Sequence, residues 1–135
     1  MSTATLRRPQ SIATIHHQIA RIRAGLSFRS VENLQKALNI PMDKIATALG
    51  ISRATLHRRR LQGRLDKAES ERVVRYQLLL KRASDVFGDQ ERARRWLTHP
   101  QPGLGNTVPI EFAKSELGAR EVENLLGRIE YSVYS

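Results

Sequence analysis

The chain has 135 residues and a formal net charge of +10, which suits one ordinary domain or two very small ones with a basic surface. Its longest apolar runs, such as residues 78–80, fall far short of the roughly 20 residues that cross a bilayer, and its N-terminus lacks the continuous apolar segment of a secretion signal, so we expect a soluble cytoplasmic protein with no membrane partner. Because the sequence has no cysteine, it excludes disulfides, thiolate metal sites, iron–sulfur clusters and cysteine nucleophiles.

The first predicted element is a helical N-terminal arm, with Ser11 as a suitable N-cap and Gly25 as a suitable stop. Its apolar residues recur at steps of 3 and 4, which is the spacing of one helical stripe: Ile12, Ile15, Ile19, Ile22 and Leu26. Such a stripe can pack on the rest of the chain or pair with its twin in a dimer. We favour dimerisation or a partner contact, because the segment precedes the main body.

Three shorter helices follow. Ser30 is the expected N-cap of the first, which ends at Asn39; the second spans 42–49 and ends at Gly50; Ser52 caps the third, which runs to about Leu61 before Gly63.

The second and third of these helices have the pattern of a helix-turn-helix. Ala46 is small where two crossing helices approach, and Gly50 tolerates the positive φ of a tight turn. The packing positions around the turn are all apolar: Ile45, Leu49, Ile51 and Leu56. A chance helical hairpin is the alternative, and the spacing favours a DNA-binding unit whose last helix presents its first turn to DNA.

The charge is concentrated in the same half of the chain. Residues 1–65 hold 12 Lys and Arg against only Glu32 and Asp43, whereas residues 66–135 hold 11 of each sign. This asymmetry predicts one surface for a polyanion, most often nucleic acid, and a second surface for something else. A merely solvated basic face is the alternative.

We therefore assign DNA contacts to the helix that starts at Ser52. Arg53 and Arg58 are expected at bases, because the arginine fork matches guanine O6 and N7. His57 shares their face, and the residues assigned mainly to phosphate are Ser52, Thr55, Arg59, Arg60 and Arg64. Arg59 stands at a usually aliphatic position, so either its stem packs or Leu61 takes over the contact.

The second half is also predicted to be helical. A long helix runs from near Lys67 to Gly88, Asp89 caps another that ends before Pro100, and residues 100–108 form a loop. Pro109 begins a short helix, and Gly118 is expected to interrupt the helical structure after it. A last amphipathic helix then leads to the tail 131–135. Since no stretch alternates with a period of two, we predict an all-α protein, with a helical arm and helix-turn-helix domain in residues 1–65 and a small helical domain in residues 66–135.

Nothing in the sequence assembles into a catalytic or metal site, so we expect no enzyme, no catalytic residue, no metal and no cofactor. The four histidines, at positions 16, 17, 57 and 99, are scattered. The glycines at 103 and 105 lack the strand and the lysine of a phosphate-binding loop.

A set of short motifs runs through residues 67–135. They are Glu69-Ser70-Glu71-Arg72, Ala83 to Gly88, Ala93 to Pro100 with Trp96-Leu97, Leu104-Gly105, Val108-Pro109-Ile110, Leu117-Gly118, Val122 to Leu126, Arg128-Ile129 and Tyr131. Together they resemble the toxin-binding domain of the Xre/MbcA/ParS antitoxins, from the RES-Xre class of bacterial toxin–antitoxin systems, in which a helix-turn-helix precedes that domain.

The resemblance implies a DNA-binding antitoxin that holds a RES-domain toxin inactive and represses its own operon. RES toxins of this type are understood to destroy NAD, and the antitoxin is thought to cover the entrance of the toxin's active site. The implied partners are the RES toxin and operator DNA, with a homodimer inside a larger complex. The rival interpretation is a stand-alone repressor whose C-terminal half dimerises or senses a ligand.

Two segments are the expected toxin-binding surface: the loop residues Leu104, Gly105 and Asn106, and the tail residues Tyr131, Tyr134 and Ser135. Tyrosine offers a large contact area at low entropic cost. The alternative is that the loop only joins two helices and the tail folds back on its own domain. Asn106 and Ser132 stand where the family more often has glycine.

Overall fold

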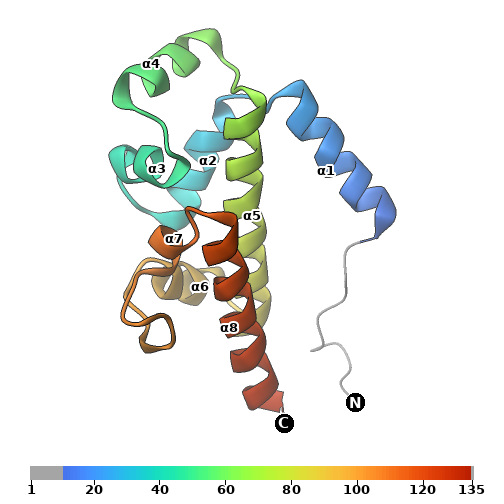
Figure 1. Ribbon diagram of the computed structural model, residues 1–135, viewed down its shortest axis with the longest axis vertical. Helices are drawn as coiled ribbons and strands as arrows, with labels where there is room; N and C mark the ends of the chain where they lie inside the picture. The colour runs from blue at the N-terminus through green and yellow to red at the C-terminus, as the bar shows by residue number, and fades with distance from the viewer. Residues whose placement is uncertain (1–10, 135) are drawn as a thin grey trace.

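The computed structural model describes residues 11–134, with side chains through Ser132, and this part of the chain is helical without a strand (Figure 1). The elements are α1 (Ile12–Ala24), α2 (Arg29–Leu38), α3 (Met42–Leu49), α4 (Arg53–Gln62), α5 (Lys67–Phe87), α6 (Gln90–Leu97), the 3₁₀ turn η2 (Pro102–Leu104), α7 (Pro109–Phe112) and α8 (Glu116–Tyr134). The predicted all-α class is confirmed. None of the described helices is both long enough and apolar enough to span a membrane.

The longest helix, α5, is the axis of the molecule. It begins with a capping box, in which the Asp66 carboxylate accepts from the Glu69 backbone N–H at 2.7 Å and the Glu69 carboxylate accepts from the Asp66 N–H at 3.0 Å. Figure 1 shows α2, α3 and α4 gathered around its N-terminal half and α6 and α8 beside its C-terminal half. A single helix therefore supports both halves of the chain.

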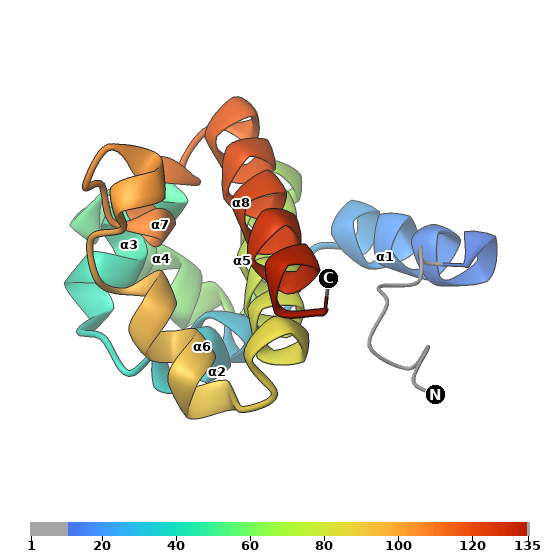
Figure 2. The ribbon, with the colours of Figure 1, turned by 90° about the horizontal axis from the view of Figure 1, so that it is seen from below.

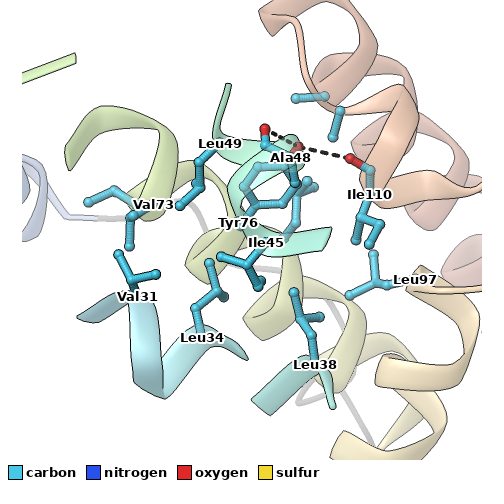
Figure 3. Packing of buried hydrophobic residues seen from close by; sticks show 14 of the residues in the cluster. Val31, Leu34, Leu38, Ile45, Ala48, Leu49, Val73, Tyr76, Leu97 and Ile110 are labelled. Carbon is cyan, nitrogen blue, oxygen red and sulfur yellow. Dashed lines mark hydrogen bonds between the residues drawn. The ribbon is translucent and has the colours of Figure 1, made fainter. Parts of the chain in front are cut away.

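One hydrophobic core runs through these helices. Its fully buried side chains come from both halves, and Figure 3 shows Val31 of α2, Ile45 and Leu49 of α3, Val73 of α5 and Leu97 of α6. Leu79 of α5 and Leu126 of α8 are fully buried as well. The domain boundary predicted after residue 65 precedes α5, which packs on α2 and α3 as well as on α6 and α8. That boundary stays a prediction.

Tyr76, near the middle of α5, joins the two halves through its hydroxyl group. The side chain is 2% exposed, and the hydroxyl oxygen lies 2.8 Å from the Ile110 carbonyl oxygen of α7 and 3.2 Å from that of Ala48 in α3 (Figure 3). Burial raises the pKa of Tyr76 to about 12, so the phenol stays a neutral donor. Tyr76 is thus part of the hydrophobic core.

Most helix ends lie where the caps predicted them, because a cap is a local interaction. Ser11 and Ser52 each accept from the backbone N–H three residues on, at 3.1 Å, and Gly50 and Gly88 close their helices with φ of 67° and 74°. Ser30 is an exception, since α2 begins at Arg29 with Phe28 as its N-cap. The buried Phe28 donates its backbone N–H to the Gly63 carbonyl at 3.0 Å, and this distant contact sets the start of α2.

The prediction that Gly118 interrupts the chain is wrong. Gly118 lies in the first turn of α8 and donates its N–H to the Ser115 hydroxyl at 3.0 Å. A Cβ at this position would stand 1.7 Å from the Phe112 carbonyl oxygen, so glycine permits the close approach of α8 to α7. At the other end α8 continues to Tyr134, and residues 131–134 are therefore helical and not a separate tail.

Replacing Tyr76 with Phe should lower the free energy of unfolding by about 1–3 kcal/mol, because buried carbonyl groups lose their donor while the ring still fills its place. Urea denaturation followed by circular dichroism measures the change. Tyr131→Phe is the matched control: Tyr131 is 74% exposed, so its change should stay within about 0.5 kcal/mol. Equal stabilities of the two variants would contradict the role given to the Tyr76 hydroxyl.

Candidate nucleic-acid interface and partner-binding surface

The helices α3 and α4 form the predicted helix-turn-helix. Gly50 takes the left-handed conformation in the turn, and Ala46 is buried at the approach of the helices with 6% of its surface exposed. The apolar packing positions are all buried, as expected: Ile45, Leu49, Ile51 and Leu56. The local chemistry of the sequence is thus sufficient to predict this motif.

Arg72 of α5 stabilises the turn of the helix-turn-helix. Sequence reasoning missed this contact. The Arg72 Nη1 donates to the Leu49 carbonyl oxygen at 3.0 Å, and its guanidinium is the nearest group to the open side of Gly50. The contact satisfies a carbonyl at the end of α3, where helical partners run out. Arg72 stands in the Glu69-Ser70-Glu71-Arg72 motif, and this was the only signal for it.

The N-terminal part of α4 presents the predicted base-reading residues to solvent. Arg53, His57 and Arg58 are exposed, while Ser52 and Thr55 form the cap, with their hydroxyl oxygens 3.0 Å apart. The Arg58 Nη2 reaches the Thr55 Oγ1 at 3.4 Å. The guanidinium groups of Arg53 and Arg58 are therefore available on one exposed helix end.

Arg59 has a different environment from the one expected. Its Nε donates to Glu69 Oε1 at 2.7 Å, and its Nη2 lies 3.3 Å from Asp66 Oδ2. The hydrogen bond to Glu69 is the main reason why the pKa of Arg59 is raised further above its usual value. The sequence left two alternatives, packing of the Arg59 stem or a contact by Leu61. The structure has the first, because the Arg59 side chain is 18% exposed and Leu61 is 75% exposed. In this structure Arg59 ties α4 to the start of α5.

Arg60 and Arg64 also make contacts within the chain. The Arg60 guanidinium lies 5.2 Å from the centre of the Phe28 ring, a cation–π arrangement. Arg64 Nη1 donates to the carbonyl oxygens of Ala24 and Gly25, the former at 3.2 Å. Both side chains remain exposed and hold the connection between α1 and α2 against the end of α4.

The predicted partner-binding loop has a buried support and an exposed tip. Leu104 is 8% exposed and belongs to the core, whereas Gly105 and Asn106 are exposed, with φ of 64° and 63°. Asparagine tolerates this left-handed conformation better than most residues, so Asn106 fits the turn. Of the three predicted loop residues, Gly105 and Asn106 at the tip are thus the ones that can offer groups to a partner.

The loop and the end of α8 lie near each other. Gly103 packs on α8 so closely that a Cβ would stand 2.9 Å from the Leu125 side chain, less than two helical turns before Tyr131. Tyr131 is 74% exposed, and Tyr134 is the last helical residue. Ser135 lies outside the described residues.

A buried ion pair underlies this end of α8, and sequence reasoning missed it. Arg82 Nη2 lies 2.8 Å from Glu130 Oε1, with side chains 7% and 12% exposed. The Arg82 Nε and Nη1 have no hydrogen-bond partner in residues 11–134. The pair holds α8 on α5, and its members are too far apart in sequence for any local pattern to connect them. No cluster of three or more potential metal ligands occurs among the residues that the structure describes.

Comparison with known proteins matches both halves of the chain to families. Residues 17–77 match the antitoxin Xre-like helix-turn-helix domain, and residues 82–131 match the antitoxin Xre/MbcA/ParS C-terminal toxin-binding domain. Antitoxin Xre of Yersinia enterocolitica is 37% identical over 116 residues, which cover 84% of this chain and 78% of the relative. Antitoxin Xre of Photorhabdus laumondii is 32% identical over 88% of this chain and 82% of the relative.

Antitoxin Xre of Pseudomonas putida is 31% identical over 61 residues, 45% of this chain and 38% of the relative. The two family matches span the helix-turn-helix, the exposed end of α4, the loop packed on α8 and Tyr131, so they cover both surfaces described above. Taken with the two longer relatives, they show that the chain belongs to the Xre/MbcA/ParS-type antitoxins of toxin–antitoxin systems.

Proposed function

We propose that this antitoxin binds and blocks a RES-domain toxin that degrades NAD, and that it represses its own operon by binding operator DNA. The observation that carries the proposal is that one chain presents an exposed, arginine-bearing helix-turn-helix at one end of α5 and matches a toxin-binding domain at the other. The identity of the toxin rests on the resemblance of residues 67–135 to the RES-Xre class. Both activities belong in the bacterial cytoplasm, where the operator DNA is.

On the DNA side, we assign base contacts to Arg53 and Arg58, which are exposed at the start of α4. Phosphate contacts fall to the residues around them: Ser52, Thr55, His57, Arg60 and Arg64, with Arg59 placing α4 on α5. A homodimer would bring two copies of α4 to the two halves of a symmetric operator. The concentration of positive charge in residues 1–65 supports this orientation.

On the toxin side, we assign contacts to Gly105 and Asn106 at the loop tip and to Tyr131, Tyr134 and Ser135 at the end of α8. Leu104 would act from beneath, by holding the loop. The support for grouping them is the packing of the loop on α8 near Leu125. A protruding loop beside an exposed aromatic residue is a shape that suits entry into the cleft of an enzyme.

Co-expression with the neighbouring open reading frame, followed by affinity purification and measurement of cellular NAD, tests the proposal as a whole. We expect a RES-domain protein to co-purify and NAD to fall only when the antitoxin is omitted. If no partner co-purifies and NAD stays level, the protein is instead a stand-alone repressor, and the toxin-side assignments are wrong.

Replacing Arg53 and Arg58 together with Ala should weaken operator binding by at least about 30-fold, because each bidentate contact to guanine contributes about 1–3 kcal/mol. Fluorescence anisotropy at a fixed salt concentration measures the loss. Inhibition of the toxin should stay intact. The control is Arg92→Ala with Arg95→Ala, which removes the same charge from exposed positions of α6, at the other end of the molecule (Figure 1). Loss of both activities without unfolding would contradict two separate surfaces.

Deleting residues 131–135 should weaken toxin inhibition and leave operator binding unchanged, because the cut removes the exposed aromatic end of α8 but keeps Glu130 and its pair with Arg82. Tyr131→Ala alone should lower affinity for the toxin about 5-fold or more, as expected for an interfacial tyrosine that contributes over 1 kcal/mol. Leu117→Ala is the control, since Leu117 is 70% exposed on the same helix. Full inhibition by the truncated protein would refute the assignment.

A further inference from the structure

Leu61, near the C-terminal end of α4, is a large apolar side chain that the core does not use. It is 75% exposed, because the stem of Arg59 packs in the place where an aliphatic residue was expected. Single exposed leucines are common on protein surfaces and by themselves need no explanation. Leu61 differs from them in its place on the helix to which the DNA contacts are assigned.

The direction of Leu61 follows from its register with Leu56, the buried residue that marks the inner face of α4. Since an α-helix turns about 100° per residue, Ala54, Arg58 and Leu61 project about 140–160° away from Leu56, within one sector about 60° wide. Ala54 and Leu61 are about 10 Å apart along the axis, and the major groove is about 12 Å wide. The whole sector, Arg58 included, therefore fits inside the groove.

The residues on either side of Leu61 are held against the chain. The Arg60 guanidinium lies 5.2 Å from the centre of the Phe28 ring, and the Gln62 Oε1 accepts from Arg59 Nη1 at 3.1 Å. These contacts fix the end of α4 and leave Leu61 as its outward-facing side chain. A partner of α4 thus meets Leu61 already in position.

Charge selects an anionic partner for this face of α4. The helix carries four arginines and no carboxylate. Arg59 pairs with the carboxylates at the start of α5, whereas Arg53, Arg58 and Arg60 make no ion pair in residues 11–134. Figures 1 and 2 both show α1 on the other side of α5 from α4, so the isoleucines of α1 do not cover Leu61 within the same chain. A polyanion such as DNA is the partner that suits unpaired arginines around Leu61.

We propose that Leu61 reads the methyl group of a thymine in the major groove of the operator, and so determines sequence specificity together with Arg58. The C5-methyl of thymine is the apolar group that base edges present in this groove, and contact with it buries the leucine. Because side chains three residues apart on a helix have Cβ atoms about 5–6 Å apart, the thymine lies within a few base pairs of the guanine assigned to Arg58. This inference rests on the operator binding in the proposed function.

The test replaces each thymine of the operator half-site, one at a time, with deoxyuridine, which removes the methyl group and keeps the base pair. Fluorescence anisotropy of the full chain at a fixed salt concentration measures the dissociation constant. At one thymine we expect it to rise about 4-fold, the ratio that corresponds to about one buried carbon group. Leu61→Ala should weaken binding to the unmodified operator by a similar factor, and should respond less than about 2-fold to the same deoxyuridine.

Leu117→Ala is the matched control, since it makes the same change at a leucine of α8 that is 70% exposed, and it should keep the full response to deoxyuridine. The inference is overturned if no deoxyuridine weakens wild-type binding, or if Leu61→Ala responds to each one as the wild type does. It is also overturned if Leu61→Ala impairs toxin inhibition and spares operator binding, because Leu61 would then contact a protein. A wild-type chain that binds no operator would instead refute the DNA-binding half of the proposed function.

Discussion

One face of α5 holds the molecule together through polar contacts set into an apolar core. Glu69, Arg72 and Tyr76 follow one another at helical spacings of 3 and 4, and so project from the same side. In turn they hold the Arg59 guanidinium of α4, the Leu49 carbonyl at the helix-turn-helix and the carbonyls of Ala48 and Ile110. Each contact satisfies a polar group that would otherwise be costly to bury, so the position of the helix-turn-helix depends on this helix.

The charge count of residues 1–65 does not show which arginines also make contacts within the chain. Arg59 already pairs with two carboxylates, Arg60 lies over Phe28, and Arg64 binds the carbonyls that end α1. Counting charges along the sequence treats all these side chains alike, whereas their geometry separates them. Within residues 11–134, Arg53 and Arg58 make no such contact with another helix. They are therefore the clearest candidates for contacts to DNA bases.

The sequence was a good guide wherever the deciding interaction was local. Caps such as Ser11 and Ser52 and the turn at Gly50 were predicted correctly, because their partners lie within a few residues. The start of α2 and the role of Gly118 were not, because a strand-like contact to Gly63 and the approach of Phe112 decide them. The pair between Arg82 and Glu130 joins two helices across the second half, and no periodicity reports on such a pair.

The continuous core has a consequence for how this protein could be altered by recombination. A cut after residue 65 would separate α3 from Tyr76 and Arg72, and so strip the helix-turn-helix of the donors for its own carbonyl groups. The helix-turn-helix and the C-terminal half therefore cannot be exchanged independently of each other. A chimera that takes its DNA specificity from one such chain and its partner from another would have to bring the first three turns of α5 along with α3 and α4, and fit the Tyr76 hydroxyl to a foreign α7.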